Sequence, residues 1–518
     1  MSSSSREAES PARRRTLLLV AAGAVAALLA LWRWSAVRIL LDDAFISYRY
    51  AANWVAGKGL VYTEGVYVEG YTNLLWTLFA AAGIAVGADP VVVTRTLGVA
   101  SYVVLVGALA VILVRKVDRL ELGALLAAVL AGGALVRPGL PALAGSGMET
   151  LFFGMLLVGA GLWVRRDCLW LSAVLASLAY LTRPEGALAL VVIPLLIWLR
   201  AARGSAPRQG LAEAARWTLV PAAVVAAHLL FRLRYYGALL PNTYYAKGAD
   251  LSHWEAGLSY LGLFVTAIPE SVVLLVLAVL AALRGASSSQ RWFSRYCLGV
   301  FGLYCVHVAK AGGDFMEYRF MWSVYPLLLL PAAAFVGDLA KQRPRPALAV
   351  AALLVIACSL GWPRQDRWTI QSLDHMGGLV DEGREIGRTL KRVLPPDTLI
   401  ATTLAGTIAY DSGLPVVDEW GLSEPYVREM PAPQDAYRGH TKRVPDAHLR
   451  ERGVQLRFEH PVIRACGRRY LQRRPIVFIR LADNRCLRAW YITQTPEFTA
   501  HVCSHPEDFE LHRIDCGP

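Results

Sequence analysis

Long apolar blocks, separated by short polar segments, fill the first 361 residues of the chain. A helix needs about 20 apolar residues to cross the hydrocarbon core of a bilayer, and most of these blocks approach that length. The pattern therefore predicts a mainly α, polytopic membrane protein with about eleven transmembrane helices. The expected spans are 16–40, 91–114, 120–136, 148–164, 168–182, 186–200, 215–233, 262–283, 295–309, 320–338 and 346–361.

One apolar segment, 71–88, is harder to place because it is short and contains Thr72, Asn73 and Thr77. If it lies at the interface without crossing, the Arg and Lys clusters between the spans all fall on one side, as the positive-inside rule requires for the cytoplasm. The same choice places the motif-bearing loops that follow four of the spans together on the opposite side. We therefore expect a cytoplasmic N-terminal tail, an uncleaved first span and outward-facing motif loops.

The pattern changes after residue 361, where long apolar blocks stop. Short β-branched runs at 398–403, 415–418 and 474–481 predict strands. The segment 404–412 predicts a short helix that ends at Gly413. The chain thus divides into a tail (1–15), a transmembrane module (16–361) with an outer loop (41–90), and a C-terminal extracytoplasmic α/β domain (362–518).

Composition agrees with a membrane protein: 55% of the 518 residues are hydrophobic and 18% are charged. The formal net charge is +13. Much of this charge lies in the short loops between apolar blocks, so it indicates membrane orientation and not nucleic-acid binding.

The eight cysteines fall into two groups. Four are in or beside apolar spans, where packing is the expected role. The other four suit disulfides in an oxidising compartment, with three alternative pairings. No CxxC pair occurs, which disfavours a zinc site. The tail group is Cys466, Cys486, Cys503 and Cys516, and the span group is Cys168, Cys297, Cys305 and Cys358.

Acids and aromatics are dense in the stretch 41–76, which directly follows the first span and opens with Asp42 and Asp43. Ionisable groups at a membrane boundary are costly and often mark a site. One interpretation is a helix N-cap, because an aspartate there accepts hydrogen bonds from free N–H groups. The other is a general base, because two neighbouring carboxylates raise each other's proton affinity. Adjacent helical residues point about 100° apart, so one of the two is expected to face a substrate.

Other outer loops repeat this mixture of charge and glycine or proline. Arg183 and Glu185 could form an ion pair with each other, or Arg183 could bind a phosphate. Asn242 could bond a sugar hydroxyl, and Lys247 could offset phosphate charge. Asp314 and Arg319 could form a self-contained surface cluster, or Arg319 could lie on the phosphate side.

Several strings in these loops resemble bacterial GT-C glycosyltransferases, in particular the mycobacterial terminal arabinofuranosyltransferase group and its relatives. They are DDAFISYRYA (42–51), GKGLVY (57–62), VEGYTNLLW (68–76), SGMET (146–150), TRPEG (182–186), LPNTYYAK (240–247), GGDFMEYRF (312–320) and AGTIAYDSGLPVVDEWGL (405–422). A further family string, Gly-His-Glu-Lys, appears as GHTK at 439–442, so Thr441 departs from it and carries no carboxylate.

The resemblance implies a multi-pass enzyme of the bacterial inner (plasma) membrane with its active site facing the periplasm or cell exterior. It implies transfer of a sugar, such as arabinofuranose or another pentose, from polyprenyl phosphate to a glycan or lipid acceptor, with inversion. Asp42 or Asp43 would be the base. Donor contacts are expected from Arg49, Arg183, Glu185, Asn242, Tyr245, Lys247, Asp314 and Arg319, and acceptor contacts from Glu69, Tyr71, Asn73 and His440.

The sequence contains no obvious phosphate-binding loop, zinc signature, serine elbow or DxD pair. No cofactor is implied with certainty, although a divalent cation beside the acidic pair stays open. The expected partners are a polyprenyl-phosphate sugar, a glycan or lipid acceptor and membrane lipids, with no nucleic acid. The alternative functions are a ligase for lipid-linked glycans, a lipid or sugar transporter, and a structural partner that binds polysaccharide.

Overall fold

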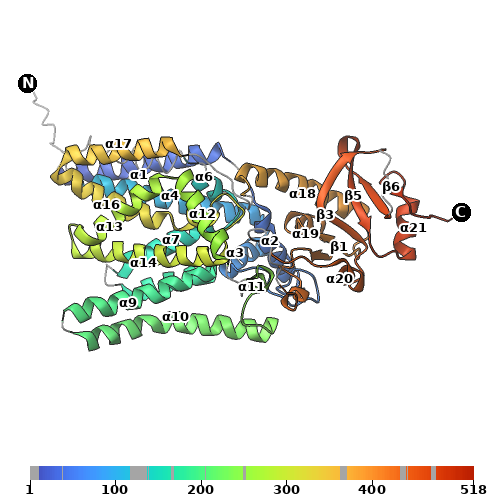
Figure 1. Ribbon diagram of the computed structural model, residues 1–518, viewed down its shortest axis with the longest axis horizontal. Helices are drawn as coiled ribbons and strands as arrows, with labels where there is room; N and C mark the ends of the chain where they lie inside the picture. Colours follow the sequence, from blue (N-terminus) through green and yellow to red (C-terminus); the bar gives the residue numbers. More distant parts are fainter. Residues whose placement is uncertain are drawn as a thin grey trace, which may run out of the picture.

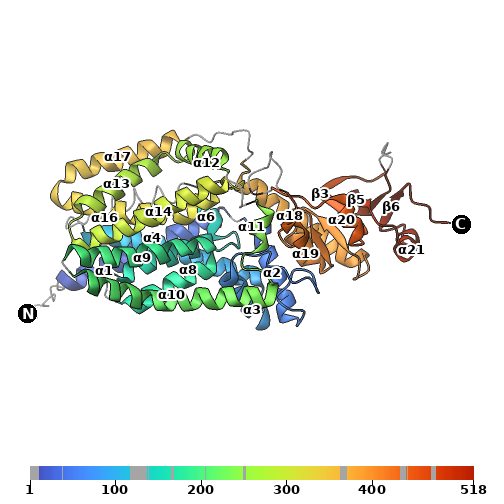
Figure 2. The ribbon, with the colours of Figure 1, turned by 60° about the horizontal axis from the view of Figure 1, so that its bottom comes forward.

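The computed structural model describes residues 11–37, 39–116, 137, 139–164, 168–204, 206–248, 253–361, 370–431, 439, 441–467 and 474–517. Its helices form an elongated bundle, and a smaller domain built around a β-sheet lies at one end of the long axis (Figure 1). Helices α2, α3 and α11 lie at the junction between the two parts in both views (Figures 1 and 2). The predicted span 120–136 lies outside the described residues.

The bundle consists mostly of long apolar helices, most of which run roughly along the long axis (Figure 1). They are α1 (Pro11–Ser35), α4 (Pro90–Lys116), α7 (Thr150–Val164), α8 (Leu169–Thr182), α9 (Ala187–Arg203), α10 (Pro207–Tyr236), α12 (Trp254–Ala267), α13 (Glu270–Arg284), α14 (Ser288–Ala311), α16 (Pro326–Gln342) and α17 (Pro344–Leu360). Short helical segments join or cap them: α6 (Gly139–Ala144), η1 (Pro184–Gly186), α11 (Asn242–Ala246) and α15 (Arg319–Val324).

Three helices among the described residues are long and apolar enough to cross a membrane: Pro90–Lys116, Pro184–Arg203 and Pro207–Tyr236. A fourth span results if α12 and α13 are counted as one bent pair. Several of the other bundle helices are shorter; the 15 residues of α7 rise only about 22 Å at 1.5 Å per residue. The number of eleven spans therefore stays a prediction.

The predicted span 262–283 is not one straight helix in the structure. The chain bends by 95° between α12 and α13. Pro269 lies at the break, and the preceding Ile268 has a non-helical backbone (φ −132°, ψ 64°). A residue before proline is sterically pushed out of the helical region, which accounts for the end of α12. The first helix also lies earlier in the chain than the predicted span 16–40, because α1 begins at Pro11 and ends at Ser35.

The outer loop contains two helices, α2 (Asp42–Val55) and α3 (Leu74–Ala85). The 12 residues of α3 rise about 18 Å, which is well short of the hydrocarbon thickness of about 30 Å. This length supports the prediction that 71–88 does not cross. Side chains of α2 and its loop, including Ile46, Tyr50 and Tyr62, pack in one apolar cluster with Ile400 and Ile408 of the C-terminal domain. The outer loop is therefore part of that domain's core.

Within the described residues, the C-terminal domain has one six-stranded sheet in the order β2-β1-β3-β5-β4-β6. Strands β2, β1 and β3 are parallel, with Ile400 opposite Val416 and Leu456, and the remaining pairs are antiparallel. The strands are β1 (Ile400–Thr402), β2 (Val416–Asp418), β3 (Leu456–Ala465), β4 (Ile476–Arg480), β5 (Arg485–Tyr491) and β6 (Phe509–His512). The helices are α18 (Leu373–Val393), α19 (Thr407–Ser412), η2 (Pro425–Arg428), α20 (Asp446–Glu451), η3 (Ala482–Asn484) and α21 (Pro496–Ser504).

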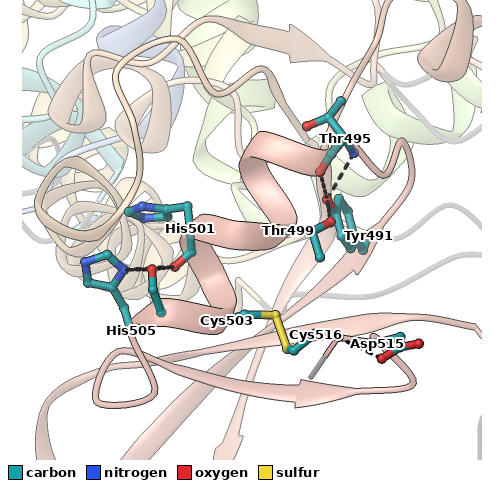
Figure 3. Close-up of a disulfide and its surroundings, with 10 residues drawn as sticks. Tyr491, Thr495, Thr499, His501, Cys503, His505, Asp515 and Cys516 are labelled. Carbon is teal, nitrogen blue, oxygen red and sulfur yellow. Dashed lines mark hydrogen bonds between the residues drawn. A yellow bond between two sulfur atoms is a disulfide. The ribbon is translucent and has the colours of Figure 1, made fainter.

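Several predictions for this domain are confirmed. The strands expected at 398–403, 415–418 and 474–481 contain β1, β2 and β4. Helix α19 ends at Gly413, whose φ of 71° is the left-handed conformation that glycine adopts without a Cβ clash. The tail cysteines form the disulfides Cys466–Cys486 and Cys503–Cys516. The second joins the end of α21 to the segment that follows β6 (Figure 3).

Candidate active site

A cavity of about 980 Å³ lies between the C-terminal domain and the end of the bundle next to it. Its wall combines the outer loop, the adjacent ends of bundle helices, residues next to α11, and Leu422, Gly439 and Thr441 of the C-terminal domain. Charged side chains of both signs line it, namely Asp43, Glu149, Arg183, Glu185, Arg232, Lys247, Glu255, Asp314 and Arg319. Apolar residues, including Leu188, Leu229 and Leu240, line the part next to α9 and α10.

Asp42 points away from this cavity and into the C-terminal domain. Its carboxylate accepts hydrogen bonds from the backbone N–H groups of Gly406 (2.8 Å) and Thr407 (2.7 Å) and from Thr407 Oγ1 (2.6 Å). The residue is only 6% exposed, and this burial raises the pKa of its carboxyl group. Asp42 does not line the cavity, so its partners give it a structural position.

Asp43 lines the cavity, with 31% of its side chain exposed. Its Oδ2 accepts a hydrogen bond from Arg319 Nη1 at 2.9 Å. The same guanidinium donates to both carboxylate oxygens of Asp314, at 2.8 and 3.2 Å. Asp314 is buried, so this two-bond contact fixes Arg319 and leaves its third nitrogen directed at Asp43. The pair Asp314–Arg319 therefore holds Asp43 in one place.

Lys247 follows α11 and also lines the cavity. Burial, together with the charge of Arg319, lowers the pKa of its ammonium group. The ammonium forms no ion pair or hydrogen bond with any residue that the structure describes. It differs in this from Arg183 and Arg319, which both contact carboxylates. Lys247 is consequently a cation that could bind an anionic group in the cavity.

The position of Lys247 is set by contacts of α11 with the C-terminal domain. The Asn242 side chain donates to the backbone oxygens of Gly421 (2.8 Å), Leu422 (3.2 Å) and Glu424 (2.9 Å), and its Oδ1 accepts from Arg428 Nε (2.8 Å). Thr441 Oγ1 also donates to the Lys247 backbone oxygen at 2.9 Å. The fully buried Asn242 side chain thus has partners for both its amide N–H groups and its carbonyl oxygen within the protein.

A chain of polar contacts crosses the cavity wall from α2 to α8. Ser47 donates to Asn73 Oδ1 (2.9 Å), and Asn73 Nδ2 donates to Glu149 Oε2 (2.9 Å). Glu149 Oε1 pairs with Arg183 Nη1 (2.8 Å), and Arg183 Nη2 lies 3.3 Å from Glu185 Oε1. The ion pair that the sequence offered for Arg183 and Glu185 is therefore present. Because two carboxylates offset the Arg183 charge, this residue is less available to a phosphate than Lys247.

Glu69 lies behind the cavity wall. Its carboxylate contacts Arg232 of α10 at 2.7 and 3.0 Å. Burial raises the pKa of Glu69 to about 7, although Arg232 opposes that change. Tyr71 lines the cavity, and its hydroxyl lies 3.1 Å from that of Tyr236.

The structure brings many of the predicted residues together and separates others. Those on the cavity wall are Asp43, Tyr71, Asn73, Arg183, Glu185, Lys247, Asp314 and Arg319. Those elsewhere are Asp42, Arg49, Glu69, Asn242 and Tyr245. His440 lies outside the described residues, although its neighbours Gly439 and Thr441 line the cavity. The Arg428 guanidinium lies over the Tyr245 ring, 5.8 Å from its centroid.

Some cavity residues were not singled out from the sequence. They are Thr72, Tyr180, Arg232, Tyr244, His253 and Glu255. Arg232 did carry a signal, because a charged residue inside an apolar span is rare and usually functional. The others carried none that distinguishes them from ordinary loop or span residues. Within the described part of the chain, no three His, Cys, Asp or Glu side chains cluster as a metal site would require.

Sequence comparison finds one relevant family and one relevant protein. Residues 370–499 match a family described as a domain of unknown function (DUF8728). The chain is 29% identical over 360 residues to the terminal beta-(1->2)-arabinofuranosyltransferase of Mycobacterium tuberculosis. That alignment covers 61% of the chain and 55% of the relative, so the chain spans about half the length of the relative it matches. The resemblance predicted from the loop motifs is confirmed by this similarity.

Two solved structures of ArnT from Cupriavidus metallidurans also align with the chain. The apo structure has 13% sequence identity and a TM-score of 0.47, and covers 93% of this chain and 98% of its own. The structure bound to undecaprenyl phosphate has 11% identity and a TM-score of 0.49, with coverages of 93% and 99%.

Proposed function

We propose that this chain is an integral-membrane glycosyltransferase of the GT-C type. It transfers a sugar, such as arabinofuranose or another pentose, from a polyprenyl-phosphate donor to a glycan or lipid acceptor outside the cytoplasm. The observation that carries the proposal is the arrangement of Asp43, Arg319 and Lys247 around one cavity at the outer end of an apolar bundle. The similarity to an arabinofuranosyltransferase supports the reaction class.

In this proposal Asp43 is the general base. Its carboxylate takes the proton of the acceptor hydroxyl while the acceptor oxygen bonds to the anomeric carbon of the sugar. The bond from that carbon to the phosphate oxygen breaks, and polyprenyl phosphate leaves with the bonding electron pair. Attack opposite the leaving group inverts the anomeric configuration. Arg319, held by Asp314, orients the Asp43 carboxylate before the reaction.

Lys247 stabilises the leaving phosphate, because negative charge develops there as the bond breaks. An ammonium already paired with a carboxylate would do this less well, and Lys247 has no such contact among the described residues. The apolar part of the wall next to α9 and α10 suits the first isoprene units of the donor. The lipid tail then extends between apolar helices, where it stays within hydrocarbon.

Asp43→Asn tests this function. With a panel of radiolabelled polyprenyl-phosphate sugars in membranes, the wild type should consume one donor. Asp43→Asn should lower its turnover by about 10²–10⁴-fold, because a positioned base contributes that much, while the variant still binds the donor. Glu64→Gln is the matched control on the same loop, since Glu64 is 65% exposed and pairs with Lys58 at the surface.

Two outcomes would contradict the proposal. Normal turnover by Asp43→Asn would show that Asp43 is not the general base. Consumption of no donor by the wild type would favour the ligase or transporter functions instead.

A further inference from the structure

The C-terminal domain makes an unusual contact with the start of α2. Strands β2, β1 and β3 are parallel, and α/β domains commonly bind ligands beyond the carboxyl ends of such strands. In this domain the segment after β1 leads to Gly406 and Thr407, whose two N–H groups and one hydroxyl all donate to Asp42. A carboxylate of the chain itself thus occupies this edge.

A second contact holds the other end of α19 to the same helix. Arg49 follows Asp42 by seven positions, or about two helical turns. Its guanidinium donates to the backbone oxygens of Ala409 (3.1 Å), Gly413 (3.4 Å) and Leu414 (2.7 Å), and its Nε donates to Tyr62 (3.0 Å). Two buried charged side chains of α2, Asp42 and Arg49, therefore hold α19 at both of its ends.

The backbones also approach closely at Asp42. A Cβ built on Gly406 would overlap the Asp42 carbonyl oxygen and lie against its carboxyl carbon. The φ of Gly406 is −82°, which any residue can adopt, so the glycine is required by the contact and not by its conformation. Together with the three hydrogen bonds, this fit leaves the first turn of α2 little freedom to move relative to the C-terminal domain.

We infer that Asp42 is a positioning residue that docks the C-terminal domain onto α2 and thereby fixes Asp43 against Arg319. The inference rests on the proposed function, in which Asp43 is the base. Asp43 is the next residue on the same helical turn, and Arg319 is anchored separately by Asp314. A shift of the first turn of α2 therefore changes the Asp43–Arg319 geometry directly. The C-terminal domain accordingly organises the catalytic centre besides covering it.

Thr407→Val and Thr407→Ser form a matched pair for the test. The valine variant loses the hydroxyl that donates to Asp42, whereas the serine variant keeps it. We expect Thr407→Val to lower kcat by about tenfold or more, because small misplacements of reacting groups are costly. Donor KM and the acid limb of the pH–rate profile should stay as in the wild type. Thr407→Ser should restore kcat to within about twofold of the wild-type value.

Hydrogen–deuterium exchange on the purified full-length protein gives a second readout that needs no activity. Asp42→Asn places an amide donor where the N–H groups of Gly406 and Thr407 need an acceptor. It should speed exchange across 406–413, and Thr407→Val should do so to a smaller extent. Asp43→Asn should leave exchange in this segment unchanged. If Asp42→Asn fails to fold, the Thr407 pair decides the question.

Unchanged exchange at 406–413 in both Asp42→Asn and Thr407→Val would overturn the inference. Loss of the acid limb in Asp42→Asn, with its retention in Asp43→Asn, would also overturn it, because Asp42 would then be the base. If the wild type consumes no donor, the proposed function fails, whereas the exchange comparison still tests the docking contact on its own.

Discussion

Asp418, at the end of β2, shows how a single buried carboxyl group can make stability depend on pH. Its oxygens accept hydrogen bonds from the backbone N–H groups of Trp420 (3.0 Å), Leu422 (2.7 Å) and Ser423 (3.3 Å). These bonds favour the ionised form, but burial outweighs them and raises the pKa of Asp418 to about 7. The folded protein therefore holds a proton that the unfolded chain, with a usual aspartate pKa near 4, releases earlier.

The sign of the effect follows from linkage. The contribution of Asp418 to stability is greatest below about pH 4, falls as the pH rises from about 4 to about 7, and then levels off, because the unfolded state binds fewer protons at this group in that window. The pKa change corresponds to at most about 4 kcal/mol. Asp418→Asn should flatten this part of the curve in thermal unfolding between pH 5 and 8. The control Asp483→Asn, at an exposed position, should leave the pH dependence unchanged. If stability falls equally steeply with pH in Asp418→Asn and in the wild type, Asp418 is not the group responsible.

Residue types alone could not separate cavity residues from structural ones. Arg49 and Asn242 are polar residues in distinctive motifs, yet both donate hydrogen bonds to backbone oxygens far away in the sequence and do not line the cavity. Asp42 and Asp43 are identical side chains in adjacent positions, and only the fold shows which one reaches the cavity. The sequence correctly indicated that the two would point in different directions, because helical geometry requires it.

At the level of elements, apolar length predicted helices well and their interruptions poorly. The hydrophobic pattern runs through Ile268 and Pro269 without a break, so it gave no sign of the 95° bend between α12 and α13. Pro269 was the available signal, since proline and the residue before it often end a helix. In the C-terminal domain, glycine and β-branched runs located α19 and three strands because turn chemistry is local.

The disulfide Cys503–Cys516 joins α21 to the segment after the last strand, β6, across a sequence separation of 13 residues. Removing a cross-link of that loop length costs about 3 kcal/mol in the chain-entropy account. The double variant Cys503→Ser/Cys516→Ser should therefore unfold its C-terminal domain at a lower temperature, as should the wild type under a reductant. Cys305→Ser, which removes a cysteine outside any disulfide, is the control. A transition that a reductant leaves unchanged would contradict this expectation.

At the scale of the whole molecule, the orientation in the membrane depends on whether 71–88 crosses. Both disulfides of the C-terminal domain suit an oxidising compartment, which agrees with an outer location. Val86, at the end of α3, is 81% exposed. Val86→Cys should react with a membrane-impermeant maleimide in intact cells, whereas Gln342→Cys, between α16 and α17, should react only after lysis. Reversal of both results would show that 71–88 crosses.

The sequence predicted many of the residues that line the cavity, but it did not predict how the fold brings them together. Motifs from five separate loops were expected on one side of the membrane, and eight of the predicted residues do meet on one wall. Their assembly depends on contacts between segments hundreds of positions apart, which no local pattern records. The same reason explains why the outer loop was not recognised as part of the C-terminal domain's core.

The docking of Asp42 against Gly406 also bears on how this architecture can be recombined. The stretch that matches a separate family, 370–499, contains α19 but not the carboxylate that α19 holds, which stands 364 positions earlier. A domain moved between relatives along that boundary would arrive without α2, its counterpart on the bundle. The unit that must be exchanged intact is discontinuous. A chimera has to include both the outer loop and the C-terminal domain from the same relative.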